Sequence, residues 1–173
     1  MSRPKKKSSQ EIKSVLDPSC GSRKFYFDKK SEVVLYGDIR DESYVQCDGR
    51  TLEIAPDQQM DVTNLPFEDE SFSLVIFDPP HLRNIGESSY MGQTYGRLPP
   101  DVAKFLRRGF DECWRVLKPN GTLIFKWGAK DFKLPFVLQT IGRKPLLGNR
   151  KPATETYWMV FFKSQEVKNE MPA

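Results

Sequence analysis

The stretch LVIFDPPH, residues 74–81, joins an apolar run to an acidic turn made rigid by two prolines. A continuous apolar run of this length is typical of a strand that is buried on both faces of a parallel sheet. The run VVLY at residues 33–36 has the same character and ends in Gly37 and Asp38. Two buried strands that both end in an aspartate predict an α/β fold whose polar residues gather at one edge of a sheet.

Helical and extended patterns alternate along the rest of the chain. From residue 102 to residue 117 apolar or small residues recur at helical spacing, and Asp101 is the expected N-cap. A second helix is expected at residues 134–141, entered through Pro135, and a short one after residue 20. Further strands are expected at residues 12–16, 122–127 and 156–162. This alternation predicts a mostly parallel sheet with helices on both faces.

The length and composition of the chain predict its organisation. With 173 residues, 38% of them hydrophobic, it is long enough for one domain and too short for two. We expect a flexible basic N-terminus at residues 1–10, a single domain at residues 11–163 and a polar tail at residues 164–173. No apolar run approaches the roughly 20 residues that span a bilayer, and the N-terminus lacks the apolar segment of a signal peptide. We therefore expect a cytoplasmic protein without a membrane partner.

The cysteines, the histidine and the charge exclude several classes of protein. The three cysteines are widely separated and form no Cys-x-x-Cys pair, which argues against a disulfide framework and a zinc site. His81 is the single histidine of the sequence, so a histidine-rich metal centre is excluded. The formal charge of +4 is compatible with an anionic partner.

Four aspartates are expected at the carboxyl ends of strands, where ligands bind in open parallel sheets. Asp17, Asp38 and Asp78 each follow an expected strand, and Asp61 lies near another. Asp38 comes about 20 residues after the first loop, a spacing that suits hydrogen bonds from a carboxylate to ribose hydroxyls. The first loop holds a single glycine, Gly21, and no Gly-x-Gly-x-x-Gly run to cradle a pyrophosphate. The sequence thus favours a nucleoside without phosphates over a dinucleotide.

At this point the chain resembles a known family. The stretches DPSCGSR, GDIR, DVTNLPF and FDPPH, which begin at residues 17, 37, 61 and 77, are similar to the motifs of class I S-adenosylmethionine-dependent methyltransferases. The runs LPFEDESF at residues 65–72 and RVLKPNG at residues 115–121 are also typical of that class. The resemblance covers nearly the whole folded chain. It implies a Rossmann-like fold with a mostly parallel seven-stranded sheet, and S-adenosyl-L-methionine as the cofactor.

Within that class, the turn at residues 78–81 resembles the (Asp/Asn/Ser)-Pro-Pro-aromatic motif of enzymes that methylate exocyclic amino groups of nucleobases, above all N6 of adenine. The small size of the chain is similar to that of stand-alone methyltransferases of phages and prophages. An adenine amino nitrogen is a poor nucleophile because its lone pair is delocalised into the ring, so hydrogen-bond acceptors must hold it and stabilise its developing charge. We expect Asp78 and the Pro79 carbonyl to be these acceptors, with Pro80 stiffening the turn and His81 stacking on an extruded base.

The resemblance also implies which residues hold the cofactor. Asp38 would bind the ribose, and Asp61 would accept a hydrogen bond from the adenine amino group of the cofactor. Asp17 and Gly21 would lie near the methionine portion. Cys20 is expected to be a small packing residue beside the cofactor. The full set of expected cofactor-binding residues is Asp17, Cys20, Gly21, Asp38, Asp61, Val62 and Asp78. No metal is required, because the sulfonium of the cofactor already supplies the leaving group.

Residues 81–99 lack clear periodicity, and two interpretations of this segment stay open. A loop of this length inside a compact domain either closes over a site as a substrate lid or is a plain surface loop. The arginines of this region and of the following helix are candidates for phosphate contacts or solvated charges. They are Arg83, Arg97, Arg107 and Arg108.

Three functions are open from the sequence alone. The favoured one is methyl transfer to a nucleic-acid base, adenine N6, with DNA favoured over RNA. The chain has no segment long enough for a separate target-recognition domain, so a homo-oligomer or a recognition partner is a further expectation. The alternatives are a methyltransferase of a small molecule or protein side chain, and a catalytically silent binding protein with the same fold.

Overall fold

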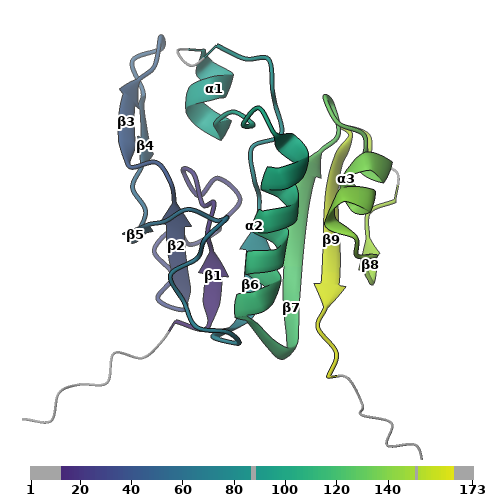
Figure 1. Cartoon of the computed structure of the whole chain (residues 1–173). Coiled ribbons are helices and arrows are strands. Elements are labelled where there is room, and N and C mark those ends of the chain that lie inside the picture. The colour runs from purple at the N-terminus through teal and green to yellow at the C-terminus, as the bar shows by residue number, and fades with distance from the viewer. Residues whose placement is uncertain (1–12, 87–88, 151, 166–173) are drawn as a thin grey trace, which may run out of the picture.

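The computed structural model describes residues 13–86, 89–150 and 152–165 (Figure 1). Its main sheet has seven strands in the order β5-β2-β1-β6-β7-β9-β8. Neighbouring strands pair in parallel except at β9, which pairs antiparallel with β7 and β8. The predicted α/β fold with a mostly parallel seven-stranded sheet is therefore confirmed. The strands are β1 (Val15–Asp17), β2 (Val34–Asp38), β5 (Gln58–Gln59), β6 (Phe72–Phe77), β7 (Leu117–Gly128), β8 (Leu147–Gly148) and β9 (Thr156–Phe162).

Buried apolar side chains fill the centre of the main sheet. Val75 and Phe77 of β6 lie opposite Leu123 and Phe125 of β7, and all four side chains are buried. The rings of Phe77 and Phe125 are stacked, with centroids 5.3 Å apart. Since β1, β2, β5 and β6 run in parallel, their carboxyl ends meet at one edge of the sheet.

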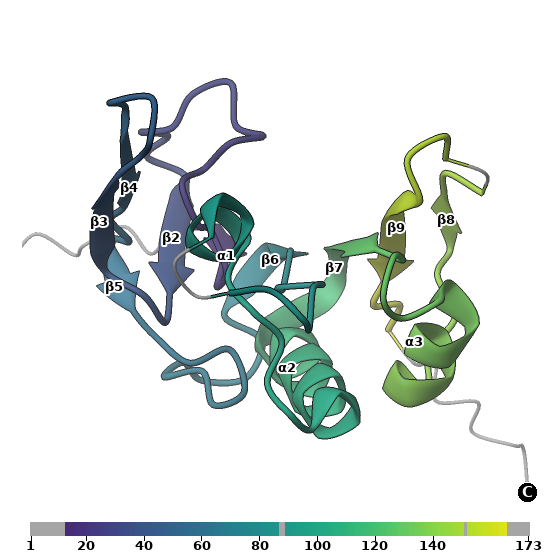
Figure 2. The same cartoon turned by 90° about the horizontal axis from the view of Figure 1, so that it is seen from above.

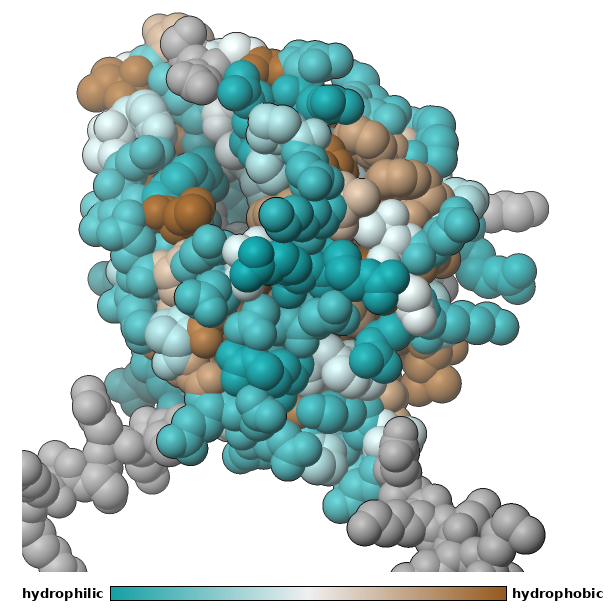
Figure 3. All heavy atoms as spheres, viewed as in Figure 1, coloured by the Kyte–Doolittle hydropathy of each residue, from teal (hydrophilic) through white to brown (hydrophobic). Residues whose placement is uncertain are grey.

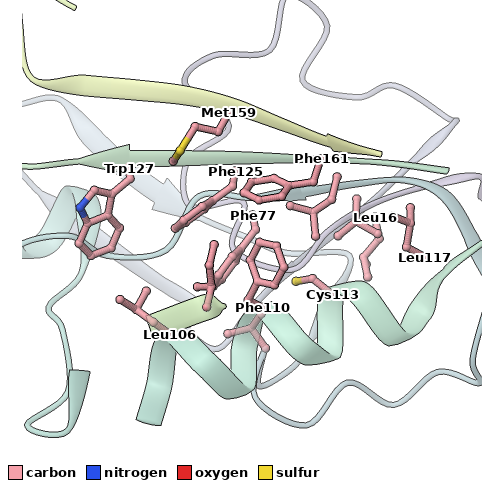
Figure 4. Close-up of a cluster of buried hydrophobic side chains, with 14 of the residues drawn as sticks. Leu16, Phe77, Leu106, Phe110, Cys113, Leu117, Phe125, Trp127, Met159 and Phe161 are labelled. Carbon is pink, nitrogen blue, oxygen red and sulfur yellow. The ribbon is translucent and has the colours of Figure 1, made fainter. Parts of the chain in front are cut away.

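One face of the sheet is covered by α2 (Val102–Val116) and α3 (Leu134–Ile141). Asp101 caps α2 as predicted, because its side chain accepts a hydrogen bond from the backbone N–H of Lys104 at 3.0 Å. The apolar stripe of α2 points into the core, where Phe110 packs edge-on against Phe161 at 5.0 Å (Figure 4). Full burial of a side chain of this size contributes about 2–3 kcal/mol to folding.

The arrangement of helices differs from the prediction that they cover both faces of the sheet. Both α2 and α3 lie on the same side of the sheet (Figure 2), and residues 18–33 form an irregular loop where a short helix was expected after residue 20. Arg23 adopts a left-handed backbone conformation with φ 55, which a helix cannot contain. Its guanidinium stacks on Tyr36 at 3.8 Å and donates to the Ala55 carbonyl at 2.8 Å. Tertiary contacts therefore hold this loop against β1 and β2 in place of a helix.

Two elements near the carboxyl edge of the sheet were not predicted. The crossover from β2 to β5 contains a hairpin of β3 (Glu42–Val45) and β4 (Thr51–Ile54), which stands at the end of the sheet beside β2 (Figure 1). The helix α1 (Tyr90–Tyr95) lies over the carboxyl edge of the sheet, between the hairpin and the start of α2. Both elements surround the edge at which the aspartates were expected.

The ends of the predicted organisation fall largely outside the described residues. The expected basic N-terminus, residues 1–10, lies outside them, and so do residues 166–173 of the expected tail. None of the helices in the described part of the chain is long and apolar enough to cross a membrane.

Candidate functional site

Two cavities adjoin at the carboxyl edge of the sheet. The larger has a volume of about 390 Å³, within the usual range of small-molecule sites, and the smaller one of about 50 Å³. The surface is hollowed below α1 on the side of the β3–β4 hairpin (Figure 3). Five residues line both cavities and so form the boundary between them: Ser19, Arg40, Asp78, Pro79 and Tyr95.

The structure brings most of the predicted site residues to these two cavities. The larger one is lined by Asp38, Asp61, Val62, Asp78, Pro79 and Pro80. The smaller one is lined by Cys20, Gly21, Asp78, Pro79 and His81. Asp17 is the exception among the expected site residues, because it lies behind the first loop and lines neither cavity.

Asp17 is completely buried at the end of β1. Its carboxylate accepts hydrogen bonds from the Ser19 backbone N–H at 3.1 Å and from the Tyr26 hydroxyl at 2.8 Å. Burial raises the pKa of Asp17 to about 7, and the negative charges of Asp78 and Asp38 act in the same direction. Asp17 therefore shapes the loop after β1, and it lies close enough to the two other carboxylates to sense their charge.

Asp38 connects three segments around the larger cavity. It follows the apolar part of β2, and it accepts hydrogen bonds from the backbone N–H groups of Gly21 at 2.8 Å and Arg40 at 3.0 Å. The Arg40 side chain forms an ion pair with Asp38 at 3.3 Å and donates to the Gln93 carbonyl at 3.0 Å in α1. Gly21 has φ +50, a conformation that glycine adopts without strain, so this backbone N–H can point at the carboxylate.

The chemistry of the larger cavity suits a nucleoside. Asp38 and Asp61 place carboxylate oxygens on its wall, and these can accept hydrogen bonds from ribose hydroxyls or an amino group. Asp61 is held by Thr63, which donates to it from the backbone at 2.8 Å and from the hydroxyl at 2.9 Å. Ile39, which is 61% exposed, and Phe105 add apolar surface against which a base ring can pack.

Asp78 forms an ion pair that the sequence analysis missed. Lys126 of β7 donates to its Oδ2 atom at 2.6 Å. The ammonium of Lys126 also lies 5.4 Å from the Phe25 ring centroid and 5.5 Å from that of Trp158. A lysine inside the apolar strand at residues 122–127 is the sequence signal that could have identified it, because a charge there requires a partner.

The electrostatics of Asp78 balance two opposing effects. Burial raises its pKa above the ordinary aspartate value, whereas the charge of Lys126 and its hydrogen bond oppose that rise. Among the described residues, the Oδ1 atom of Asp78 accepts no hydrogen bond, so one oxygen is free to meet a ligand. The Ser19 hydroxyl accepts a hydrogen bond from the Asp78 backbone N–H at 3.0 Å and holds this turn against the loop after β1.

His81 lines the smaller cavity and packs beside two aromatic rings. Its ring lies 6.0 Å from that of Tyr95 and 6.4 Å, edge-on, from that of Trp127. A Cβ atom on Gly128 would come within 2.5 Å of the His81 ring, so only glycine leaves room for it there. Burial lowers the pKa of His81, although the charge of Asp78 opposes this. The imidazole is therefore held neutral at physiological pH.

The described residues of the candidate lid, residues 81–86 and 89–99, are folded against the site. Ser89 caps α1 by accepting a hydrogen bond from the Gly92 N–H at 3.0 Å, and the Leu98 N–H donates to the Leu82 carbonyl at 2.9 Å. Tyr95 of α1 faces both cavities. Whether this segment opens and closes stays a prediction.

The remaining candidates lie at different places. Arg97 lines the larger cavity, whereas Arg83, Arg107 and Arg108 are exposed outside it. Within the described residues, no group of three His, Cys, Asp or Glu side chains could hold a metal ion.

Comparison with known proteins identifies the fold. No protein-family model matches the chain, and no curated protein sequence matches it. Among solved structures, the PH0226 protein from Pyrococcus horikoshii OT3 is 16% identical, with a TM-score of 0.54, over 87% of this chain and 81% of that one. A TehB-like SAM-dependent methyltransferase from Corynebacterium glutamicum is 15% identical, with a TM-score of 0.51, over 87% of this chain and 79% of that one. The chain has the Rossmann-like fold of class I methyltransferases.

Proposed function

We propose that this chain is a methyltransferase that uses S-adenosyl-L-methionine and methylates an exocyclic amino group of a nucleic-acid base, N6 of adenine, with DNA as the favoured acceptor. The observation that carries the proposal is the position of Asp78 and Pro79 on the wall shared by two cavities. A cofactor nucleoside fits the chemistry of the larger cavity. An acceptor that enters the smaller one would meet the carboxylate at the boundary.

The residues of the larger cavity fit the cofactor. Asp38 would accept hydrogen bonds from the ribose, Asp61 from the adenine amino group, and Ile39 and Val62 would contact the ring. Cys20 and Gly21, which line the smaller cavity, would lie beside the methionine portion. When bound, the cofactor supplies an electrophilic methyl group and a neutral thioether as its leaving group.

Asp78 would act on the acceptor amine. Its free Oδ1 atom can accept a hydrogen bond from the amino group, while the hydrogen bond from Lys126 to Oδ2 favours the ionised form of the carboxylate. A carboxylate at this position stabilises the positive charge that develops on nitrogen as the C–N bond forms, and it can accept the proton that leaves. The Pro79 carbonyl would accept the second amino hydrogen, and His81 and Tyr95 offer rings for contact with the base.

The test is transfer of a labelled methyl group from S-adenosylmethionine to separate pools of DNA, RNA and protein, followed by mass spectrometry of the nucleosides. We expect label in N6-methyladenine from the DNA pool. Label confined to protein, or no transfer to any pool, would show that the proposed acceptor is wrong.

Replacing Asp78 tests its role directly. Asp78→Ala should lower the rate of transfer about 100-fold or more, because the developing charge loses its acceptor, while cofactor affinity measured by calorimetry stays within a few-fold. The matched control is Asp111→Ala, which removes an exposed carboxylate on α2. A rate for Asp78→Ala equal to that of the control would remove Asp78 from the mechanism.

A further inference from the structure

A third cavity, of about 550 Å³, lies beside the candidate site and forms an open groove. Its walls come from the loop after β1, the β3–β4 hairpin and Tyr90 of α1. Gly21, Ser22 and Lys24 line both this groove and the smaller cavity. The groove therefore adjoins the smaller cavity, whose wall includes Asp78.

The groove is strongly cationic. The charged residues that line it are Arg23, Lys24, Lys29, Lys30, Arg50 and Glu53, five cations and one carboxylate. Arg23 is paired with Asp57 and Arg50 with Asp48, but Lys29 and Lys30 form no ion pair with any residue that the structure describes. S-adenosylmethionine carries a single carboxylate and no phosphate, so the cofactor leaves this concentration of positive charge unexplained.

Buried polar atoms point to a ligand in the same place. The Ser22 hydroxyl and the Gln46 side-chain amide nitrogen are buried in the described structure without a hydrogen-bond partner, and both residues line the groove. A third such atom, the Thr94 hydroxyl, belongs to a residue that lines the adjoining cavity. Buried polar groups in proteins are normally satisfied, so three unsatisfied groups along one continuous surface indicate a bound polar ligand.

We propose that this groove binds the phosphodiester backbone of a single-stranded nucleic acid beside the nucleotide whose base reaches Asp78. The inference rests on the proposed function and adds the path of the strand. A base amino group can reach the smaller cavity only when the base has left its stack, and its phosphates then need a cationic surface close by. Tyr90 is 46% exposed at the groove, with the Lys24 ammonium 5.5 Å from its ring, and offers a face on which a neighbouring base can stack.

The test compares two double variants that carry the same net charge. Lys29→Glu with Lys30→Glu reverses two groove cations, and Lys118→Glu with Lys144→Glu reverses two exposed lysines outside it. Either change lowers the formal charge from +4 to 0. Binding of labelled single-stranded oligonucleotides is measured by fluorescence anisotropy at several salt concentrations, in one arm with DNA and in another with RNA. Thermal melting and S-adenosylmethionine affinity confirm that each variant is folded.

The groove variant should bind about tenfold more weakly than the control. The negative slope of log K against log salt should become less steep by about 1.4, for two lost contacts to a single strand. Equal binding by the two variants, or no binding of either oligonucleotide by the wild-type protein, would overturn the proposal. Methyl transfer by the wild-type protein is scored separately. Groove-dependent binding without methyl transfer would support the groove as a nucleic-acid site and refute the proposed acceptor. Methyl transfer together with equal binding by the two variants would support the acceptor and refute the groove.

Discussion

The buried carboxyl of Asp17 makes a quantitative prediction about stability and pH. Asp17 has a pKa of about 7 in the folded chain, against 3.8 for an unperturbed aspartate. The folded state thus binds the proton more tightly than the unfolded state does. Stability from this group is fully present below the unfolded pKa and is lost as the pH rises through the folded pKa. The difference of about three pH units corresponds to about 4 kcal/mol, of which about 2.5 kcal/mol is lost between pH 5 and pH 8.

The substitution Asp17→Asn removes this titration while keeping the shape of the side chain. The asparagine oxygen can still accept from Ser19, and its amide can donate to the Tyr26 hydroxyl, which reverses the direction of that bond. Relative to the wild type, the free energy of unfolding of the variant should therefore rise by about 2.5 kcal/mol from pH 5 to pH 8.

Urea denaturation followed by tryptophan fluorescence at the two pH values measures this difference. Titrating groups remote from Asp17 contribute equally to both proteins and cancel in the comparison. The matched control is Asp111→Asn, at an exposed position on α2, which should show no such change. If the wild type and Asp17→Asn keep the same difference in stability at pH 5 and pH 8, Asp17 is not the buried, weakly acidic group described here.

Two further predictions concern the ion pair of the site and the core. Lys126→Met keeps an apolar stem but leaves Asp78 without its counter-ion, so the pKa of Asp78 should rise and the acid limb of the pH–rate profile should move to higher pH. The control Lys130→Met, at an exposed position, should leave the profile unchanged. An unchanged profile for Lys126→Met would rule out the ion pair. Phe110→Ala should lower the free energy of unfolding by about 3–5 kcal/mol because it leaves a cavity between α2 and the sheet. The exposed Phe136→Ala should cost far less in the same denaturation assay, and equal losses would contradict the assigned core.

The local pattern of the sequence was sufficient for the main strands and helices. The strand β9 and the helix α3 coincide with residues 156–162 and 134–141, because periodic apolar residues and a proline in the first turn are local signals. The hairpin of β3 and β4 was missed, although the pair Asp48-Gly49 lies between two segments in which apolar and polar residues alternate. Gly49 has φ 79, as glycine allows in such a turn. That signal was available in the sequence.

Part of the candidate site was also predictable from local sequence patterns. Aspartates that follow buried parallel strands must meet at one edge, so Asp38 and Asp78 could be placed there from the sequence. The burial of Asp17 could not, because it depends on the path of the loop that Tyr26 and Arg23 hold against β1 and β2. The absence of the helix expected after residue 20 depends on the same loop.

By itself, the sequence determined the class of the fold, its central strands and the edge where acidic residues collect, since these depend on periodicity and on the common direction of parallel strands. Only the tertiary structure decided which charges meet. Lys126 and Asp78 are 48 positions apart, and the groove cations come from a loop and a hairpin that no periodic pattern connects. Contacts of this kind are set by how distant segments pack, because neighbouring residues in the chain carry no information about them.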